Sequence, residues 1–91
     1  METNRMIIRN LDSLATPETI ENLFSTYGDV NSIRINRGTG TGVVQMTSAT
    51  EAKRVFNKLD GSVLWGRTME ISILNDSLRH RLRYLLSKYL G

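Results

Sequence analysis

Hydrophobic and polar residues follow two different periods along this chain. Residues 30–36 and 68–74 alternate apolar and polar side chains, and residues 5–11 do so more loosely, which is typical of half-buried strands. A further apolar run that ends at Met46 directly follows a glycine-rich turn, and this order is typical of a hairpin that leads into a strand. The pattern therefore predicts four strands, of which the middle two are joined by the glycine-rich turn.

Two helices are predicted between these strands, both from their ends and from their periodicity. Thr16 is a favourable N-cap for the first helix, and Pro17 suits its first turn. Ser48 and Glu51 have the spacing of a capping box at the start of the second helix. Each helix carries one apolar stripe, made of Ile20, Leu23, Phe24 and Tyr27 in the first helix and of Ala52, Val55, Phe56 and Leu59 in the second.

The order of these elements predicts the fold class. Strand, helix, strand, strand, helix, strand is the order of the split βαβ, or ferredoxin-like, α+β sandwich. In this βαββαβ fold a four-stranded antiparallel sheet carries two helices on one face. We expect residues 1–75 to form this domain, and we expect its uncovered sheet face to be the functional surface.

Residues 76–91 differ from the rest of the chain in charge and in periodicity. Residues 1–75 hold eight basic and eight acidic side chains, so the net charge of +3 arises from residues 76–91. Here we expect a basic C-terminal amphipathic helix, whose apolar arc contains Leu78, Leu82, Leu85, Leu86 and Tyr89. This arc either folds back over the open sheet face or pairs with a protein partner or a second copy of the chain, as a homodimer.

The composition argues against several classes of function. The absence of cysteine excludes disulfides, thiolate zinc sites and cysteine nucleophiles. His80 is the only histidine and has no partner at ligand or catalytic spacing, so we expect no metal site, no cofactor and no enzymatic activity. No apolar run reaches the roughly eighteen residues of a membrane helix, and the N-terminal residues lack the pattern of a secretion signal. We therefore expect an intracellular protein, cytoplasmic or nuclear, with no membrane partner.

The glycine-rich turn needs an interpretation of its own. Gly38, Gly40 and Gly42 alternate with threonine, as glycines do in some phosphate-binding loops. Those loops open a helix whose N-terminus binds the anion, whereas this one enters a strand, so we expect no nucleotide fold of that kind. We expect either a mobile hairpin whose Arg37 reaches a backbone phosphate or simply a turn that needs residues tolerant of positive φ.

Three short segments carry residues that are typical of one protein family. They are residues 8–11 (Ile-Arg-Asn-Leu) at the end of the first strand, residues 23–30 (Leu-Phe-Ser-Thr-Tyr-Gly-Asp-Val) closing the first helix, and residues 59–71 (Leu-Asp-Gly-Ser-Val-Leu-Trp-Gly-Arg-Thr-Met-Glu-Ile) leading into the last strand. With them, residues 5–75 resemble the RNA recognition motif, which implies the fold predicted above and binding of single-stranded RNA on the open sheet face. The positions of the family's stacking aromatics are held here by Ile7, Thr41 and Val43. Stacking contributes ~1–3 kcal/mol per base, and these side chains cannot supply it.

The alternation of the strands and the placement of charge predict the binding residues. Side chains out of phase with the buried apolar residues should lie on the open face. Arginine pairs with phosphate or stacks on a base, while amides and hydroxyls bond to base edges. The predicted nucleic-acid-binding residues are Ile7, Arg9, Arg34, Asn36, Arg37, Thr41, Val43 and Gln45, together with Arg79, Arg81 and Arg83 of the C-terminal segment.

Two functions are consistent with this surface. The first is an RNA-binding module that holds single-stranded RNA on the sheet face and the basic hairpin and tail, without aromatic stacking. The alternative is a protein-interaction or self-association module that uses the sheet face and the C-terminal helix. A third interpretation leaves the arginines of the face solvated and partly paired with Glu70, without a ligand.

Overall fold

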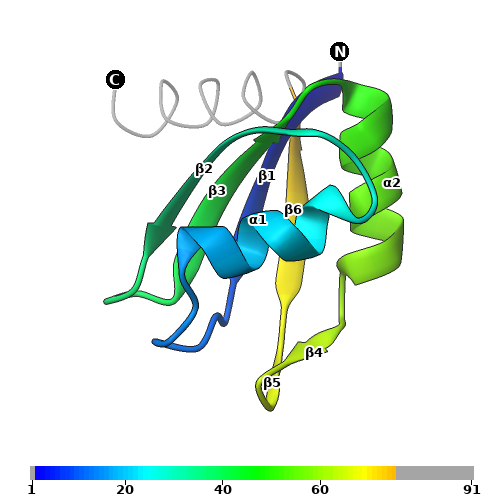
Figure 1. Cartoon of the computed structure of the whole chain (residues 1–91). Helices are drawn as coiled ribbons and strands as arrows, with labels where there is room; N and C mark the ends of the chain where they lie inside the picture. Colours follow the sequence, from blue (N-terminus) through cyan, green and yellow to red (C-terminus); the bar gives the residue numbers. More distant parts are fainter. Residues whose placement is uncertain (1, 76–91) are drawn as a thin grey trace, which may run out of the picture.

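A computed structural model of the chain describes residues 2–75, which form an antiparallel sheet with two helices on one face (Figure 1). The main sheet has the strand order β2-β3-β1-β6 and is made of β1 (Glu2–Arg9), β2 (Val30–Asn36), β3 (Thr41–Met46) and β6 (Glu70–Asn75). One face of this sheet is covered by α1 (Pro17–Ser25) and α2 (Ala49–Leu59). The predicted βαββαβ fold class is therefore confirmed.

The predicted C-terminal helix lies outside the described residues. Outside them also lie its apolar residues Leu78, Leu82, Leu85, Leu86 and Tyr89 and its arginines Arg79, Arg81 and Arg83. The roles predicted for these side chains, and the predicted division of the chain after residue 75, stay predictions.

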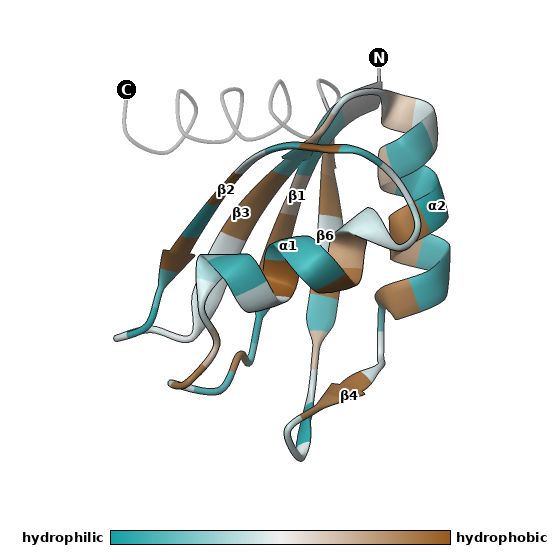
Figure 2. Cartoon of the chain, in the orientation of Figure 1, coloured by the Kyte–Doolittle hydropathy of each residue, from teal (hydrophilic) through white to brown (hydrophobic). Residues whose placement is uncertain are grey.

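The core lies between the two helices and the sheet. Alternate residues of the strands point into it and are completely buried, as Met6 and Ile8 of β1 and Val44 and Met46 of β3 illustrate. The helices contribute the buried side chains Ile20, Phe24, Ala52, Val55 and Leu59. Figure 2 shows apolar and hydrophilic residues alternating along α2, as expected for a helix that buries one stripe. Within residues 2–75, neither helix covers the other face of the sheet (Figure 1).

Both helices begin at the predicted residues. The Thr16 hydroxyl accepts a hydrogen bond from the Thr19 N–H at 3.2 Å, and the Ser48 hydroxyl accepts one from the Glu51 N–H at 3.2 Å. The Glu51 carboxylate also accepts the Asp29 N–H, at 3.2 Å, and the Thr47 hydroxyl. This carboxylate therefore connects the start of α2 to the segment that precedes β2.

The last predicted strand is divided in the structure. Its first residue belongs to a separate hairpin of β4 (Val63–Leu64) and β5 (Arg67–Thr68), and only β6 joins the main sheet. Trp65 and Gly66 form the turn with positive φ angles of 51° and 79°, as a two-residue hairpin turn requires. Trp65 is 50% exposed on this hairpin.

Candidate nucleic acid interface

The open face of the sheet carries side chains from all four of its strands. Val43 of β3 lies opposite Arg34 of β2 on one side and opposite Ile7 of β1 on the other. Ile7 in turn lies opposite Ser72 of β6. Val43 is 42% exposed, whereas the neighbouring Val44 is completely buried. A row with an apolar centre and polar ends therefore crosses the sheet, as the alternation predicts.

A hollow of about 430 Å³ lies on this face between β1, β2 and β3. We call it the sheet hollow, and it is lined by Arg5, Ser32, Arg34, Val43 and Gln45. The Ser32 hydroxyl donates to Gln45 Oε1 at 3.4 Å, so the Gln45 amide nitrogen remains directed to a ligand or to water. The hollow combines guanidinium, amide, hydroxyl and apolar groups within one surface.

Two residues of the sheet hollow were absent from the predicted binding residues. Arg5 is on the open face by its phase in β1, and its register partner on β3 is Gln45. Ser32 shares the phase of Arg34, two residues further along β2. The alternation of the strands contained this signal, but only the strand pairing brings both residues to the same hollow.

Two arginines of the open face, Arg9 and Arg34, have side chains without a partner in the described part of the chain. Arg9 lies opposite Glu70 in the pairing of β1 with β6, yet the two side chains form no ion pair in the described part of the chain. Arg34 is exposed, and its guanidinium group likewise has no hydrogen-bond partner among residues 2–75. Both guanidinium groups can therefore meet an anion without first breaking a contact within the described domain.

Two of the predicted binding residues, Asn36 and Thr41, make hydrogen bonds within the β2–β3 hairpin. The Asn36 side-chain oxygen accepts hydrogen bonds from the Gly38 N–H at 3.0 Å and the Thr39 N–H at 3.3 Å. The hydroxyls of Thr39 and Thr41 are 2.7 Å apart and share a hydrogen bond. Asn36 therefore builds the turn with its oxygen and keeps only its amide nitrogen for a ligand.

The β2–β3 hairpin is tied to the β1–α1 loop. The Leu11 N–H donates to the Gly40 carbonyl at 2.9 Å. Gly40 has a φ of 67°, and a Cβ added there would lie 2.8 Å from the Leu11 carbonyl oxygen. Among the three glycines of this turn, Gly40 has a positive φ, whereas Gly38 and Gly42 do not. Arg37 is exposed on this hairpin.

Residues 2–75 contain no group of three or more His, Cys, Asp or Glu side chains arranged to hold a metal ion. In the same range, no helix is long and apolar enough to cross a membrane.

The fold and its open face define a class of protein, and comparison with known families identifies it. Residues 6–70 match the family model of the RNA recognition motif, so the chain belongs to that family. The chain is 32% identical over 73 residues to polyadenylate-binding protein 4 of Arabidopsis thaliana, and the match covers 75% of this chain and 11% of that protein. It is 34% identical over 67 residues to paraspeckle component 1 of Homo sapiens, covering 74% of this chain and 13% of that protein.

The solved structures agree with this assignment. The first RNA recognition motif domain of Hrb1 has a TM-score of 0.74 and 28% identity to this chain, covering 80% of this chain and 81% of that domain. In contrast to its match with that single domain, this chain spans only about a tenth of the length of the two curated relatives. What those larger proteins do as wholes therefore does not transfer with the fold.

Proposed function

We propose that this chain is an RNA-binding module that holds single-stranded RNA across the open face of its sheet without aromatic stacking. The observation that carries the proposal is the sheet hollow, where Arg5 and Arg34 flank the apolar Val43 and the amide of Gln45. Membership of the RNA recognition motif family supports it. The name of the Arabidopsis relative, a polyadenylate-binding protein, makes adenosine oligonucleotides a suitable first probe.

Each group of the surface has a role that its chemistry suits. Arg34 can pair with a phosphate or lie flat on a base, and the Gln45 amide can bond to a base edge. Val43 and Ile7 offer apolar contact to the same base. Arg9 and the hairpin residue Arg37 extend the positive charge toward the backbone of the RNA. We propose the same phosphate role for Arg79, Arg81 and Arg83.

Binding of this kind should depend strongly on salt. Without stacking, which contributes ~1–3 kcal/mol per base, the electrostatic share of the binding free energy is larger. No residue of the described domain is proposed to have a catalytic role.

The test is a titration of the full chain with single-stranded RNA pools at several salt concentrations. We expect saturable binding whose logarithmic salt slope decreases by about 0.7 in Arg34→Gln if Arg34 contacts a phosphate. If Arg34 stacks on a base, the affinity should fall with little change in slope. Arg54→Gln is the matched control, because Arg54 is an exposed arginine on α2, which covers the opposite face. Absence of salt-sensitive binding below the high-micromolar range would reject the proposed function.

A second candidate is self-association through the same face. It is favoured by the small apolar centre of Val43 and Ile7, which lie opposite each other at the middle of the sheet. The predicted leucine-rich helix would add Leu78, Leu82, Leu85, Leu86 and Tyr89 to such a contact. Sedimentation equilibrium distinguishes the two candidates, because a dimer that masks the face should dissociate when RNA is added. A monomer at all concentrations would count against self-association.

A further inference from the structure

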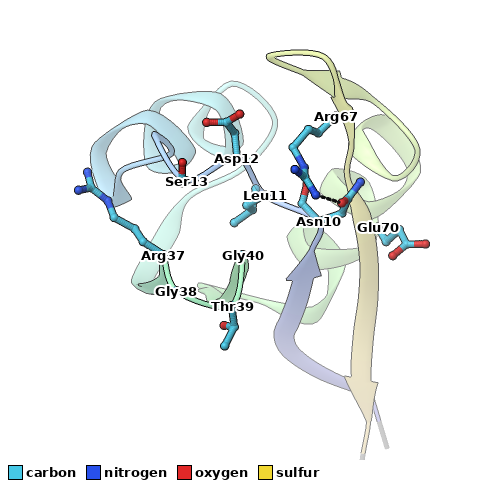
Figure 3. Close-up of a pocket in the computed structure, with 10 residues that line it drawn as sticks. All are labelled: Asn10, Leu11, Asp12, Ser13, Arg37, Gly38, Thr39, Gly40, Arg67 and Glu70. Carbon is cyan, nitrogen blue, oxygen red and sulfur yellow. Dashed lines mark hydrogen bonds between the residues drawn. The ribbon is translucent and has the colours of Figure 1, made fainter.

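A second hollow lies at the end of the sheet where three connections meet, and Figure 3 shows the residues that line it. The β1–α1 loop, the β2–β3 hairpin and the β4–β5 hairpin all reach this end of the molecule (Figure 1). The space between them has a volume of about 460 Å³. We call it the loop depression, and its polar lining includes Asp12, Ser13, Arg37, Thr39, Arg67 and Glu70. Residues distant in the sequence thus share one open site.

Hydrogen bonds between the connections hold the walls of the loop depression in place. Arg67 Nη2 donates to Asn10 Oδ1 at 2.6 Å, the contact drawn as a dashed line in Figure 3. The Asn10 amide nitrogen donates in turn to the Thr68 carbonyl at 2.8 Å. The backbone hydrogen bond from the Leu11 N–H to the Gly40 carbonyl connects the β1–α1 loop to the β2–β3 hairpin, which forms the remaining wall. These hydrogen bonds fix the positions of the three connections relative to one another.

The lining offers both donors to an anion and acceptors for amino groups. Figure 3 shows Arg37 on one side and Arg67 with Glu70 on the other. Asp12 uses Oδ1 to accept the Leu14 N–H at 2.8 Å, while its Oδ2 accepts no hydrogen bond from residues 2–75. The Glu70 carboxylate also forms no hydrogen bond or ion pair within that range. Two guanidinium groups and two carboxylates around one hollow are complementary to a nucleotide, which carries a phosphate and, in three of the four bases, an exocyclic amine.

The loop depression is continuous with the proposed RNA surface through Glu70. This residue lines the depression and also faces Arg9 across the pairing of β1 with β6. The depression therefore borders the strand residues Arg9 and Glu70 at the edge of the proposed RNA surface.

We propose that the loop depression is a nucleotide subsite for single-stranded RNA that selects bases with an exocyclic amino group. One unpaired nucleotide places its phosphate between Arg37 and Arg67, and its base amine donates to Asp12 or Glu70. Uracil has no exocyclic amine and is the disfavoured base. The inference rests on the proposed function, because it assigns a second position on the same RNA strand.

The first experiment compares roughly eight-nucleotide homopolymers of A, C and U binding to the full chain. We expect A and C to bind about tenfold more tightly than U, as a hydrogen bond to a charged acceptor would give. Asp12→Asn and Glu70→Gln should reduce this ratio toward one. The ratio is the readout because Glu70→Gln also removes a negative charge near the RNA and should raise the affinity for every sequence. Glu21→Gln, at an exposed position on α1, should leave the ratio unchanged.

The second experiment observes the site without an oligonucleotide. Titration with adenosine monophosphate should shift the backbone amide resonances of Leu11, Gly38, Thr39 and Gly40, while uridine monophosphate and inorganic phosphate should shift them less. Arg67→Gln should weaken this response, and Arg54→Gln should not. A folded amide spectrum of each variant establishes that the loss is local.

The outcomes separate the two proposals. One outcome rejects the subsite and keeps the proposed function. In it RNA binds and Arg34→Gln weakens the binding, but the ratio of the affinities for A and U is near one. A ratio that Asp12→Asn and Glu70→Gln leave unchanged has the same meaning. If adenosine monophosphate shifts the amide resonances of the loop depression but RNA pools show no salt-sensitive binding, the subsite stands and RNA binding on the sheet face is rejected. If neither ligand binds, both are rejected.

Discussion

Gly40 brings the β2–β3 hairpin into contact with the β1–α1 loop at Leu11. Its φ of 67° disfavours any side chain, and the Leu11 carbonyl oxygen occupies the space that a Cβ would need. Gly61 has a similar φ of 83°, but nothing lies within 4 Å of the position that a Cβ would take there. Alanine substitutions at Gly40 and Gly61 therefore separate the effect of backbone strain from the effect of a steric clash.

We predict that Gly40→Ala lowers the free energy of unfolding by about 2–4 kcal/mol, because strain and clash act together. Gly61→Ala should lower it by only about 1 kcal/mol, through strain alone. Urea denaturation of both variants measures the difference. Equal losses would mean that the hairpin moves away from Leu11 at no cost, and that the loop depression is less firmly built than the hydrogen bonds indicate.

Glu51 supplies a prediction about pH. The Thr47 hydroxyl and the Asp29 N–H, which both donate to its carboxylate, lower the pKa of Glu51. A carboxyl group whose pKa is lower in the folded state stabilises the fold above its unfolded pKa, and this stability is lost as the pH falls through the folded pKa. Wild type should therefore exceed Glu51→Gln in unfolding free energy at neutral pH, and the difference should shrink as the pH falls below the ordinary glutamate value of about 4.3.

The measurement is denaturation of wild type and Glu51→Gln between neutral and acidic pH. Glu21→Gln provides the control, since Glu21 is exposed on α1 and its carboxylate has no hydrogen-bond partner among the described residues. A difference between wild type and Glu51→Gln that does not change with pH would contradict the role of the ionised carboxylate.

At the scale of elements, α1 depends on a single side chain at its start. The Thr16 hydroxyl accepts the Thr19 N–H, and Pro17 occupies the first turn, where no backbone donor is needed. Thr16→Ala should cost about 1 kcal/mol of stability, whereas Thr16→Ser keeps the acceptor and should be close to neutral. Thermal unfolding with both variants checks this, and similar losses for Ala and Ser would show that packing of the threonine methyl group matters more than the cap.

The β4–β5 hairpin is the element whose position depends most on distant residues. Asn10 has a positive φ of 66°, which asparagine tolerates better than most residues, and its side chain contacts both Arg67 and the Thr68 carbonyl. Asn10 therefore joins the end of the central strand to this hairpin. The same contact fixes one wall of the loop depression.

At the scale of the whole molecule, the open face has the shape of an RNA recognition surface but not its aromatic groups. Val43 lies at the centre of this face, where the family has a stacking aromatic. Val43→Phe should increase the affinity for single-stranded RNA by about 5- to 150-fold, the equivalent of ~1–3 kcal/mol for one stacked base. Direct titration at fixed salt measures this gain.

Val63→Phe is the matched control for this gain, because Val63 is a valine on the β4–β5 hairpin that is 67% exposed and lies outside the sheet face. If both phenylalanines raise the affinity equally, the effect is nonspecific apolar attraction. If neither does, RNA does not cross the centre of the sheet in the manner proposed.

Much of the fold follows from the sequence because its signals are local. The period of two placed Ile7 and Val43 on the open face, and the caps at Thr16 and Ser48 marked the helix starts. Each of these depends on residues a few positions apart, which the chain specifies before it folds. The fold class followed from the order of elements, because few topologies bury two helical stripes on one face of a sheet.

Tertiary structure decided the features that join distant residues. Only the folded chain shows that the Asn36 oxygen closes a turn, that Ser32 enters the sheet hollow, and that Glu51 reaches Asp29. The loop depression likewise requires three connections to meet, with Asn10 bonded to a residue 57 positions away. Local propensity contains no term for such contacts, since they depend on how the packed elements direct their loops. The sequence by itself thus determined the sheet, its helices and its open face, and the tertiary structure determined which side chains remain available there and where a second site is formed.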